Sequence, residues 1–309
     1  MRLSVVIPIY KNSTGLRELN EKLVARESEF SKLGFDFETI FVVDGSPDDS
    51  FSVLSELKGS GLTPANTRII KLSRNFGQVP ALLAGLELAE GDCTICYSAD
   101  MQDPSELFMP MFESFKKGNE IVIATRESRS DGFLWDLTSK VGYHLLRSEV
   151  PSIPKGGFDF FLVGRKSKNL LLQRNGSKRF LQGDLINLGF SPIEIKYNRV
   201  KRKYGKSSYS LRKRVSIFSD AFYDSSDMPI KVATKFGFGI AGLGFVSTMY
   251  VLFGFFSGKQ PFNGFAALAC GILILGGMQL AIIGIIGEYI YRTYDIARNR
   301  PHFAVEKVV

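Results

Sequence analysis

The sequence has few of the residues from which disulfide frameworks and zinc sites are built. It contains three cysteines and two histidines in 309 residues. Cys93 and Cys96 form a lone CxxC inside an apolar run, with no second pair. Disulfide-rich folds and structural zinc sites both need more Cys or His than this. We therefore expect neither, and we interpret the cysteines as core residues.

Charge is absent from two long segments near the C-terminal end of the sequence. Residues 236–256 and 262–287 contain no Asp, Glu, Lys or Arg. Each is longer than the ~20 residues that cross a bilayer core as a helix. The short connection Ser257–Pro261 then makes the pair a helical hairpin, so the sequence predicts two transmembrane helices.

Acidic residues are outnumbered, 31 to 39, and the formal net charge is +8. Basic residues crowd the two outer flanks of the hairpin, whereas its turn has only Lys259. The positive-inside rule then predicts a multi-pass protein whose N-terminal part and both termini are cytoplasmic. The charge favours anionic lipid and an anionic substrate as partners. Nucleic acid also attracts basic proteins but would not explain the hairpin, so we expect no nucleic acid partner.

The first 125 residues alternate short apolar runs with amphipathic ones, a pattern that predicts a mostly parallel sheet flanked by helices. We expect strands at 3–7, 39–43, 68–72, 92–97, 120–124, 158–163 and 193–200. We expect helices at 15–33, 48–58, 80–89, after Pro104, 133–147 and 177–189. The resulting organisation is a domain at 1–208, an amphipathic interfacial segment at 209–230, the two-helix segment at 231–290 and a cytoplasmic tail at 291–309.

Polar turns follow the predicted strands and should meet at one edge of the sheet. Asp44 ends the second strand, and Asp100 and Gln102 follow the fourth. Ligands of open α/β sheets bind at this edge, and Mg²⁺ commonly bridges one or two carboxylates to substrate phosphates. Arg126, Arg129 and Lys140 are candidates for binding phosphate. The alternatives are helix capping for a single Asp and plain surface charge for each Arg or Lys.

Several motifs occur in a fixed order along the chain. They are Val5-Val6-Ile7-Pro8-Ile9-Tyr10, Val43-Asp44-Gly45-Ser46, Arg74-Asn75-Phe76-Gly77-Gln78, Ala99-Asp100-Met101-Gln102-Asp103-Pro104, Arg202-Lys203-Tyr204-Gly205-Lys206-Ser207-Ser208-Tyr209 and Gly287-Glu288-Tyr289. In this the chain resembles the family 2 glycosyltransferases with a GT-A (Rossmann-like) fold. More narrowly, it is similar to the membrane-anchored bacterial polyprenyl-phosphate glycosyltransferases, relatives of dolichol-phosphate mannose synthase. The resemblance runs almost from end to end.

The resemblance implies a role for each matching residue. Pro8, Tyr10, Asp44, Ser98 and Gln102 would contact the nucleotide donor. Asp100 and Gln102 would hold Mg²⁺ or Mn²⁺ beside the diphosphate, and Asp100, Asp159 and Arg126 would be the catalytic set. Phosphate and acceptor-loop contacts would come from Arg129, Lys140, Arg202, Ser207 and Tyr209.

Some positions depart from the family pattern. Val43 stands where a second acid is common, which would remove one base or ribose contact. Ser98 replaces the first acid of the metal motif, and a hydroxyl is a poorer Mg²⁺ ligand than a carboxylate. Tyr10-Lys11-Asn12 replaces Tyr-Asn-Glu, and Ser208 stands where Lys is common. Together these departures point to an unusual donor.

The resemblance implies inverting transfer of a sugar from a nucleotide sugar to undecaprenyl phosphate at the cytoplasmic face of a bacterial inner membrane. The lipid-linked sugar would serve envelope glycan or lipopolysaccharide modification. A processive polysaccharide synthase is disfavoured because the only tryptophan, Trp135, lies outside a QxxRW motif. A catalytically silent membrane adaptor of the same fold is the remaining alternative. The helical hairpin also leaves a homo-oligomer possible.

Overall fold

The computed structural model describes residues 1–127, 154, 158–174, 179–200, 228–257, 264–298 and 300–309. The chain divides into two compact units. The first consists of Met1–Ser225 together with Asn299–Val309, and the second is Ser226–Arg298. The predicted helix at 133–147 and most of the interfacial segment at 209–230 lie outside the described residues.

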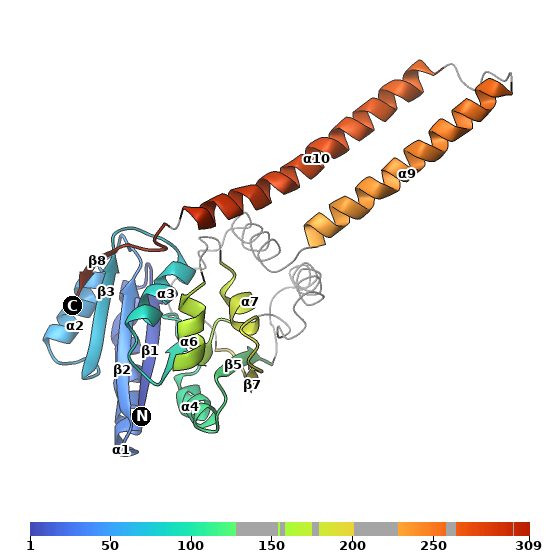
Figure 1. The fold of residues 1–309 in the computed structure, drawn as a ribbon. Coiled ribbons are helices and arrows are strands. Elements are labelled where there is room, and N and C mark those ends of the chain that lie inside the picture. Colours follow the sequence, from blue (N-terminus) through green and yellow to red (C-terminus); the bar gives the residue numbers. More distant parts are fainter. Residues whose placement is uncertain (128–153, 155–157, 175–178, 201–227, 258–263, 299) are drawn as a thin grey trace. The chain divides into compact units, whose positions relative to one another are not determined.

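Within the described residues, the first unit contains one sheet of eight strands in the order β7-β5-β6-β4-β1-β2-β3-β8 (Figure 1). The strands are β1 Arg2–Ile9, β2 Asp36–Val43, β3 Asn66–Leu72, β4 Cys93–Cys96, β5 Ile121–Arg126, β6 Phe161–Gly164, β7 Ile193–Tyr197 and β8 Val305–Val308. Pairing is parallel among β4, β1, β2 and β3 and between β5 and β7. β6 and β8 run antiparallel to their neighbours. The predicted mostly parallel sheet is therefore confirmed.

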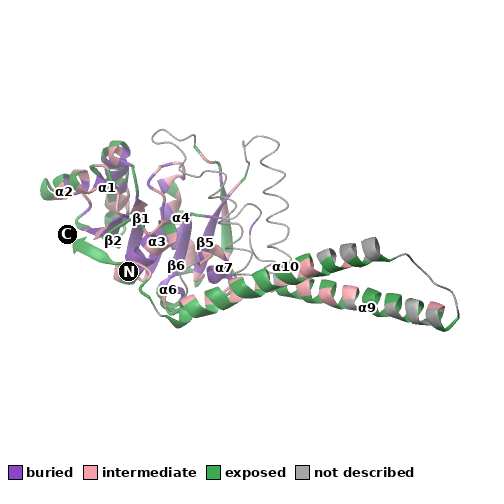
Figure 2. Cartoon of the chain, turned by 90° about the horizontal axis from the view of Figure 1, so that it is seen from above, coloured by how far each residue is buried: buried purple, intermediate pink, exposed green. Residues whose placement is uncertain are grey.

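Helices cover both faces of the sheet, as the alternating pattern predicts. They are η1 Ser13–Gly15, α1 Leu16–Lys32, α2 Ser50–Gly59, α3 Gln78–Leu88, η2 Ser105–Leu107, α4 Phe108–Lys116, α6 Arg165–Leu172 and α7 Leu181–Ile186. One core joins α1, α2 and α4 to the sheet through side chains such as Leu19 and Phe112. The other core joins α3, α6 and α7 to the opposite face through side chains such as Leu82 and Leu185. Figure 2 shows the central strands largely buried.

The strand order changes direction at β1, and in open α/β sheets the C-terminal edge at such a point forms a crevice. β2 and β3 lie on one side of β1, and β4 lies on the other. The oxygen of Val6 accepts the N–H of Tyr97 on the β4 side, and the oxygen of Ile9 accepts the N–H of Asp44 on the β2 side. Because backbone groups alternate along a strand, Pro8 faces the β4 side, beyond the last residue of β4. Such a switch point is where open α/β sheets bind ligands.

Several predicted boundaries shift. β1 continues past Pro8, which was expected to end it, because the missing N–H of Pro8 has no partner strand to lose. The strand expected at 158–163 begins only at Phe161, and the helix expected at 177–189 is described as Leu181–Ile186. α6 was not predicted, and the last predicted strand ends at Tyr197 rather than residue 200.

The segment expected to be a plain cytoplasmic tail contributes a strand to the sheet. β8 pairs with β3 in antiparallel register, with Ile70 opposite Val308 and Leu72 opposite Val305. The ion pair between Lys71 Nζ and Glu306 Oε1, at 2.7 Å, adds a cross-strand contact. The chain therefore returns to the first unit after α10, and the domain is completed by residues far beyond position 208.

The second unit consists of two long helices, α9 Met228–Phe256 and α10 Phe265–Ala297, which contact each other. Most of their described side chains are exposed, in contrast to the first unit (Figure 2). Among the described residues, one window, Ile230–Ser247 in α9, is long and apolar enough to cross a membrane, judged by length and composition alone. The predicted second crossing in α10 stays a prediction.

Candidate active site

The loops that follow β1, β2 and β4 are joined by hydrogen bonds around the crevice. The buried Asn12 donates from Nδ2 to the backbone oxygen of Ala99 at 2.9 Å, which connects the β1 loop to the β4 loop. The N–H of Lys11 donates to Ser46 Oγ at 2.8 Å, which connects the β1 loop to the β2 loop. Lys11 has a positive φ of 52°, a conformation that costs a non-glycine residue energy and that surrounding contacts must hold. The rim of the crevice is therefore a fixed surface.

Asp48 is the acceptor at the centre of the β2 loop. Its Oδ1 accepts the hydroxyls of Ser46 and Ser50, each at 2.6 Å, and its Oδ2 accepts the N–H of Ser13 at 3.0 Å. Burial raises the pKa of Asp48, but the hydrogen bonds from Ser46, Ser50 and Ser13 outweigh burial and hold that pKa well below its usual range. The sequence-based reasoning missed this residue, although the Ser-Pro-Asp-Asp-Ser spacing is typical of side chains that cap turns.

Asp44 supports the start of α3. Its side chain is buried, and its two oxygens accept the backbone N–H groups of Phe76 at 2.7 Å and Gly77 at 2.8 Å. Gly77 is the N-cap residue of α3, and its N–H is one of the groups that a helix start leaves unsatisfied. Asp44 therefore positions the loop at 74–77, and its predicted contact with a nucleotide stays a prediction. Pro8 and the exposed Tyr10 lie beside it at the end of β1.

The turn after β4 presents Asp100 and Gln102 with Met101 between them. Met101 has a positive φ of 53° and is buried in the core, which fixes the direction of its two neighbours. The N–H of Gln102 donates to Asp100 Oδ1 at 3.2 Å. Gln102 is also tied to Val200, because Val200 N–H donates to its backbone oxygen at 3.0 Å and its Nε2 donates to Val200 O at 3.4 Å. Ser98 is half-buried at the start of the turn.

This turn offers oxygen ligands to a hard cation. Asp100 supplies a carboxylate and Gln102 an amide oxygen, and no group of three or more His, Cys, Asp or Glu suited to a metal occurs among the described residues. Mg²⁺ is typically held by one or two carboxylates, with substrate phosphates and water completing its shell. The residues therefore fit a divalent ion that arrives with a diphosphate, rather than a fully protein-enclosed metal site.

A buried polar chain runs from this turn to the end of β5. The carboxylate of Asp103 is 1% exposed and accepts the hydroxyl of Tyr197. Tyr197 in turn accepts a side-chain hydrogen bond from Arg126, which lies opposite it in the β5–β7 register. Arg126 Nη2 then lies 3.8 Å from Asp159 Oδ2. Burial raises the pKa of Asp103, although the Tyr197 hydrogen bond and the charge of Arg199 act in the opposite direction.

Asp159 is the exposed end of this chain, and Gln182 lies beside it. Gln182 Nε2 donates to the backbone oxygen of Phe158 at 2.6 Å and lies 3.4 Å from Asp159 Oδ1. The structure therefore brings the predicted residues Asp100, Arg126 and Asp159 into one connected set of side chains. Tyr197, Arg199 and Gln182 were missed. Tyr197 and Arg199 lie near the end of the strand predicted at 193–200. Parallel pairing of that strand with β5 would have placed them at the same edge of the sheet as Arg126.

Five predicted site residues lie outside the described residues. They are Arg129, Lys140, Arg202, Ser207 and Tyr209. Their roles stay predictions.

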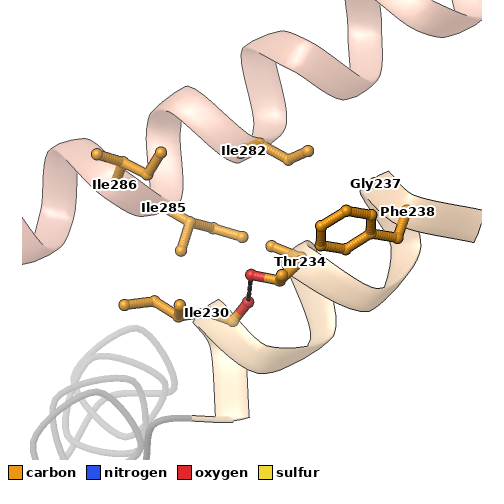
Figure 3. A pocket seen from close by; sticks show the side chains of 8 residues that line it. Ile230, Thr234, Gly237, Phe238, Ile282, Ile285 and Ile286 are labelled. Carbon is orange, nitrogen blue, oxygen red and sulfur yellow. Dashed lines mark hydrogen bonds between the residues drawn. The ribbon is translucent and has the colours of Figure 1, made fainter. Parts of the chain in front are cut away.

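The second unit has an apolar groove of about 360 Å³ between α9 and α10. Side chains from the first turns of α9 face side chains from the later part of α10 (Figure 3). The lining residues are Ile230, Ala233, Thr234, Gly237, Phe238, Ile282, Ile285 and Ile286. The one hydroxyl among them, on Thr234, donates to the oxygen of Ile230 at 2.8 Å, so the groove is apolar in effect.

The part of the sequence that forms most of this sheet and its acidic turn is matched by one family model. Residues 4–169 match the model for glycosyl transferase family 2. The chain belongs to this family.

Full-length relatives agree that it is a glycosyltransferase. It is 32% identical over 309 residues to the uncharacterized glycosyltransferase YkcC of Bacillus subtilis, covering 99% of this chain and 94% of the relative. It is 31% identical over 315 residues to the SfII prophage-derived bactoprenol glucosyl transferase of Shigella flexneri, covering 99% and 98%. The similarity thus extends over both units.

Solved structures with a similar fold match most of the chain. Glucosyl-3-phosphoglycerate synthase of Mycobacterium tuberculosis, crystallised with Mn²⁺, UDP and phosphoglyceric acid, matches with a TM-score of 0.52 at 17% identity. The match covers 72% of this chain and 76% of the other. A second match, with a TM-score of 0.52 at 15% identity, is mannosyl-3-phosphoglycerate synthase of Rubrobacter xylanophilus, covering 71% of each chain. These likenesses establish the GT-A type of sheet.

Proposed function

We propose that this glycosyltransferase moves a sugar from a nucleotide-sugar donor to a polyprenyl phosphate at the membrane surface, with inversion at the anomeric carbon. The observation that carries the proposal is the connected set Asp100–Arg199–Asp103–Tyr197–Arg126–Asp159 at the switch point. It combines a cation-binding turn with a fixed guanidinium and an exposed carboxylate. The similarity to a bactoprenol glucosyl transferase over 99% of the chain supports the lipid acceptor.

The chemical step needs no covalent enzyme intermediate. An oxygen of the acceptor phosphate attacks the anomeric carbon, and the bond from that carbon to the donor diphosphate breaks. The electron pair leaves on the β-phosphate oxygen. A phosphate monoester has a second pKa of about 6, so the acceptor is largely dianionic near neutral pH and no proton has to be abstracted from it. Alignment and charge stabilisation are what the protein must supply.

The residues at the turn can supply the charge stabilisation. A divalent ion held by Asp100 and Gln102 would neutralise charge on the leaving diphosphate. Arg126 is held by Tyr197 and lies near Asp159, so its guanidinium is placed to meet a phosphate oxygen at the same edge. Asp159 is exposed at the end of the polar chain and is oriented by Gln182, which suits a carboxylate that accepts sugar hydroxyls.

A lipid acceptor also requires an apolar surface, and the second unit has one. The groove between α9 and α10 lies at the end of α9 that carries Lys231 and Lys235. We propose that it takes the isoprenoid units next to the phosphate, and that α9 and α10 both cross the bilayer. The antiparallel contact of the two helices and the return of the chain to β8 support a hairpin whose ends emerge on one side.

The test uses the full chain in detergent with undecaprenyl phosphate and a panel of radiolabelled nucleotide sugars. Label that partitions into organic solvent measures transfer, and lanes with Mg²⁺, Mn²⁺ or chelator measure cation dependence. We expect lipid-soluble label from one donor. In Asp100→Asn we expect the rate of transfer to fall at least about tenfold, because removing one charge-stabilising contact typically lowers the rate by that much or more. Nucleotide binding without transfer from any donor would instead support the silent-adaptor alternative.

A further inference from the structure

Arg199 lies between two carboxylates and makes a well-formed hydrogen bond to neither. Its Nη2 is 3.7 Å from Asp100 Oδ2, and its Nε is 3.4 Å from Asp103 Oδ1. Its side chain is 27% exposed, compared with 15% for Asp100 and 1% for Asp103. Arg199 is thus a largely enclosed cation directly beside the turn that would hold a divalent ion.

Two buried atoms of this cluster are unsatisfied. Arg199 Nε and Asp103 Oδ2 have no hydrogen-bond partner among the described residues. A donor and an acceptor left unpaired in this way are costly when buried. A guanidinium binds one carboxylate best, through two parallel N–H···O bonds. The unpaired Nε of Arg199 and the unpaired Oδ2 of Asp103 could therefore take part in such a two-bond pair. In the present position, the guanidinium lies between Asp103 and Asp100 instead.

The backbone around Arg199 is attached to the same turn. The next residue, Val200, is joined to Gln102 by one backbone and one side-chain hydrogen bond. The backbone of Arg199 is therefore anchored beside Asp100, and its guanidinium lies within 4 Å of both carboxylates.

We propose that Arg199 is a positioning residue that pairs with Asp100 when the turn holds no divalent ion, and pairs fully with Asp103 when Asp100 binds one. The inference rests on the proposed cation site of the transfer reaction. Arg199 then competes with the divalent ion for Asp100, and Asp103 weakens this competition by offering the alternative partner. When the ion takes Asp100, Arg199 pairs with Asp103 through two parallel N–H···O bonds. Arg199 Nε and Asp103 Oδ2 then both have a hydrogen-bond partner.

This arrangement predicts opposite effects for its two members. In Arg199→Gln the competing cation is gone, and Mn²⁺ should bind about fivefold more tightly, which is the upper end for a partly exposed ion pair. In Asp103→Asn the alternative partner loses its charge, Arg199 stays on Asp100, and Mn²⁺ should bind about fivefold more weakly. In the double variant the Asp103 change should have almost no effect, because the competitor it controls is absent.

The experiment measures Mn²⁺ affinity by electron paramagnetic resonance of the free ion, with the full chain in detergent and with saturating UDP. Arg165→Gln is the matched control. It removes the same charge from an exposed ion pair with Asp92, at the other end of β4, and should leave the affinity unchanged. Arg199→Lys keeps the charge but loses the fork, so its Mn²⁺ affinity should stay below that of Arg199→Gln.

The outcomes separate this inference from the proposed function. Tighter binding in Arg199→Gln, unchanged binding in Arg165→Gln and non-additivity in the double variant would support it. Equal or weaker binding in Arg199→Gln would overturn it and leave the cation site in place. Absence of Mn²⁺ binding in every variant would overturn the cation site itself, and this inference with it. The Arg199 result decides the matter even if Asp103→Asn does not fold.

Discussion

Gly45→Ala is the substitution that tests most directly how the crevice is built. Gly45 has a positive φ of 51°, and a Cβ at this position would lie 2.2 Å from the carbonyl carbon of Arg74 and 2.3 Å from the nitrogen of Asn75. Both contacts are backbone atoms, so no side-chain rotation can relieve them. The loop at 74–77 must move, and with it the N–H groups that Asp44 accepts from Phe76 and Gly77.

The magnitude follows from these contacts. The left-handed conformation alone costs a non-glycine residue about 1–2 kcal/mol. Loss of even one N–H bond to the buried Asp44 carboxylate adds about 1.5–3 kcal/mol. We expect a total of at least about 2.5 kcal/mol. A matched control is available in Gly61, which has a φ of 65° with nothing within 4 Å of its added Cβ, so Gly61→Ala should show the conformational cost alone.

The assay is thermal unfolding of both variants in detergent, together with UDP binding. At about 2–4 °C per kcal/mol for a domain of this size, the lost hydrogen bond of about 1.5–3 kcal/mol should make Gly45→Ala melt at least about 3 °C below Gly61→Ala. Its UDP affinity should also fall, because the displaced loop borders the crevice. Equal melting temperatures for the two variants would refute the close approach of the two loops.

Three further predictions concern the site and the groove. Asp48→Asn should lower stability at neutral pH. Because the folded-state pKa of Asp48 is depressed, its contribution to stability is present above the unfolded pKa of about 3.9 and is lost as pH falls below it. The melting temperature should therefore fall less steeply between pH 4 and pH 3 in the variant than in the unsubstituted protein. An unchanged fall of the melting temperature in acid contradicts this. Tyr197→Phe should lower kcat about tenfold with little change in donor KM, because the hydroxyl holds Arg126. Steady-state kinetics measure both quantities, and a change in donor KM alone contradicts that role. Gly237→Ile should raise KM for undecaprenyl phosphate and for the short farnesyl phosphate, because both carry the isoprenoid units next to the phosphate, whereas Gly239→Ile, outside the groove, should change neither; equal effects of the two variants contradict the groove assignment.

The sheet and its functional edge could be predicted because they depend on local patterns. Short apolar runs alternate with helical ones up to residue 125, and a parallel arrangement then brings all the strand ends to one edge. Asp100, Gln102 and Arg126 were placed correctly at that edge for this reason. Pro8 was misread as a strand end because local propensity does not reveal that the neighbouring strand stops first.

Long-range pairing could not be predicted from the sequence. Nothing local indicates that β6 inserts antiparallel between β4 and β5, or that Tyr197 lies opposite Arg126. The contact of Asp103 with Tyr197 depends on that register, so the polar chain was not predicted, and Arg199 was overlooked as part of the site. β8 was missed because four exposed residues, Val305–Val308, have no amphipathic pattern of their own and become a strand only beside β3.

The position of β8 has a consequence for how the protein is made. An edge strand with unpaired N–H and C=O groups invites pairing with other chains, and β3 is such an edge until Val305–Val308 arrive. Synthesis proceeds from the N-terminus, so β3 is complete long before α9, α10 and finally β8 leave the ribosome. Until β8 has been made, the nascent sheet therefore carries an open side, which a chaperone could recognise. A tag that obstructs β8 would trap the enzyme in this immature, aggregation-prone form even when α9 and α10 have formed.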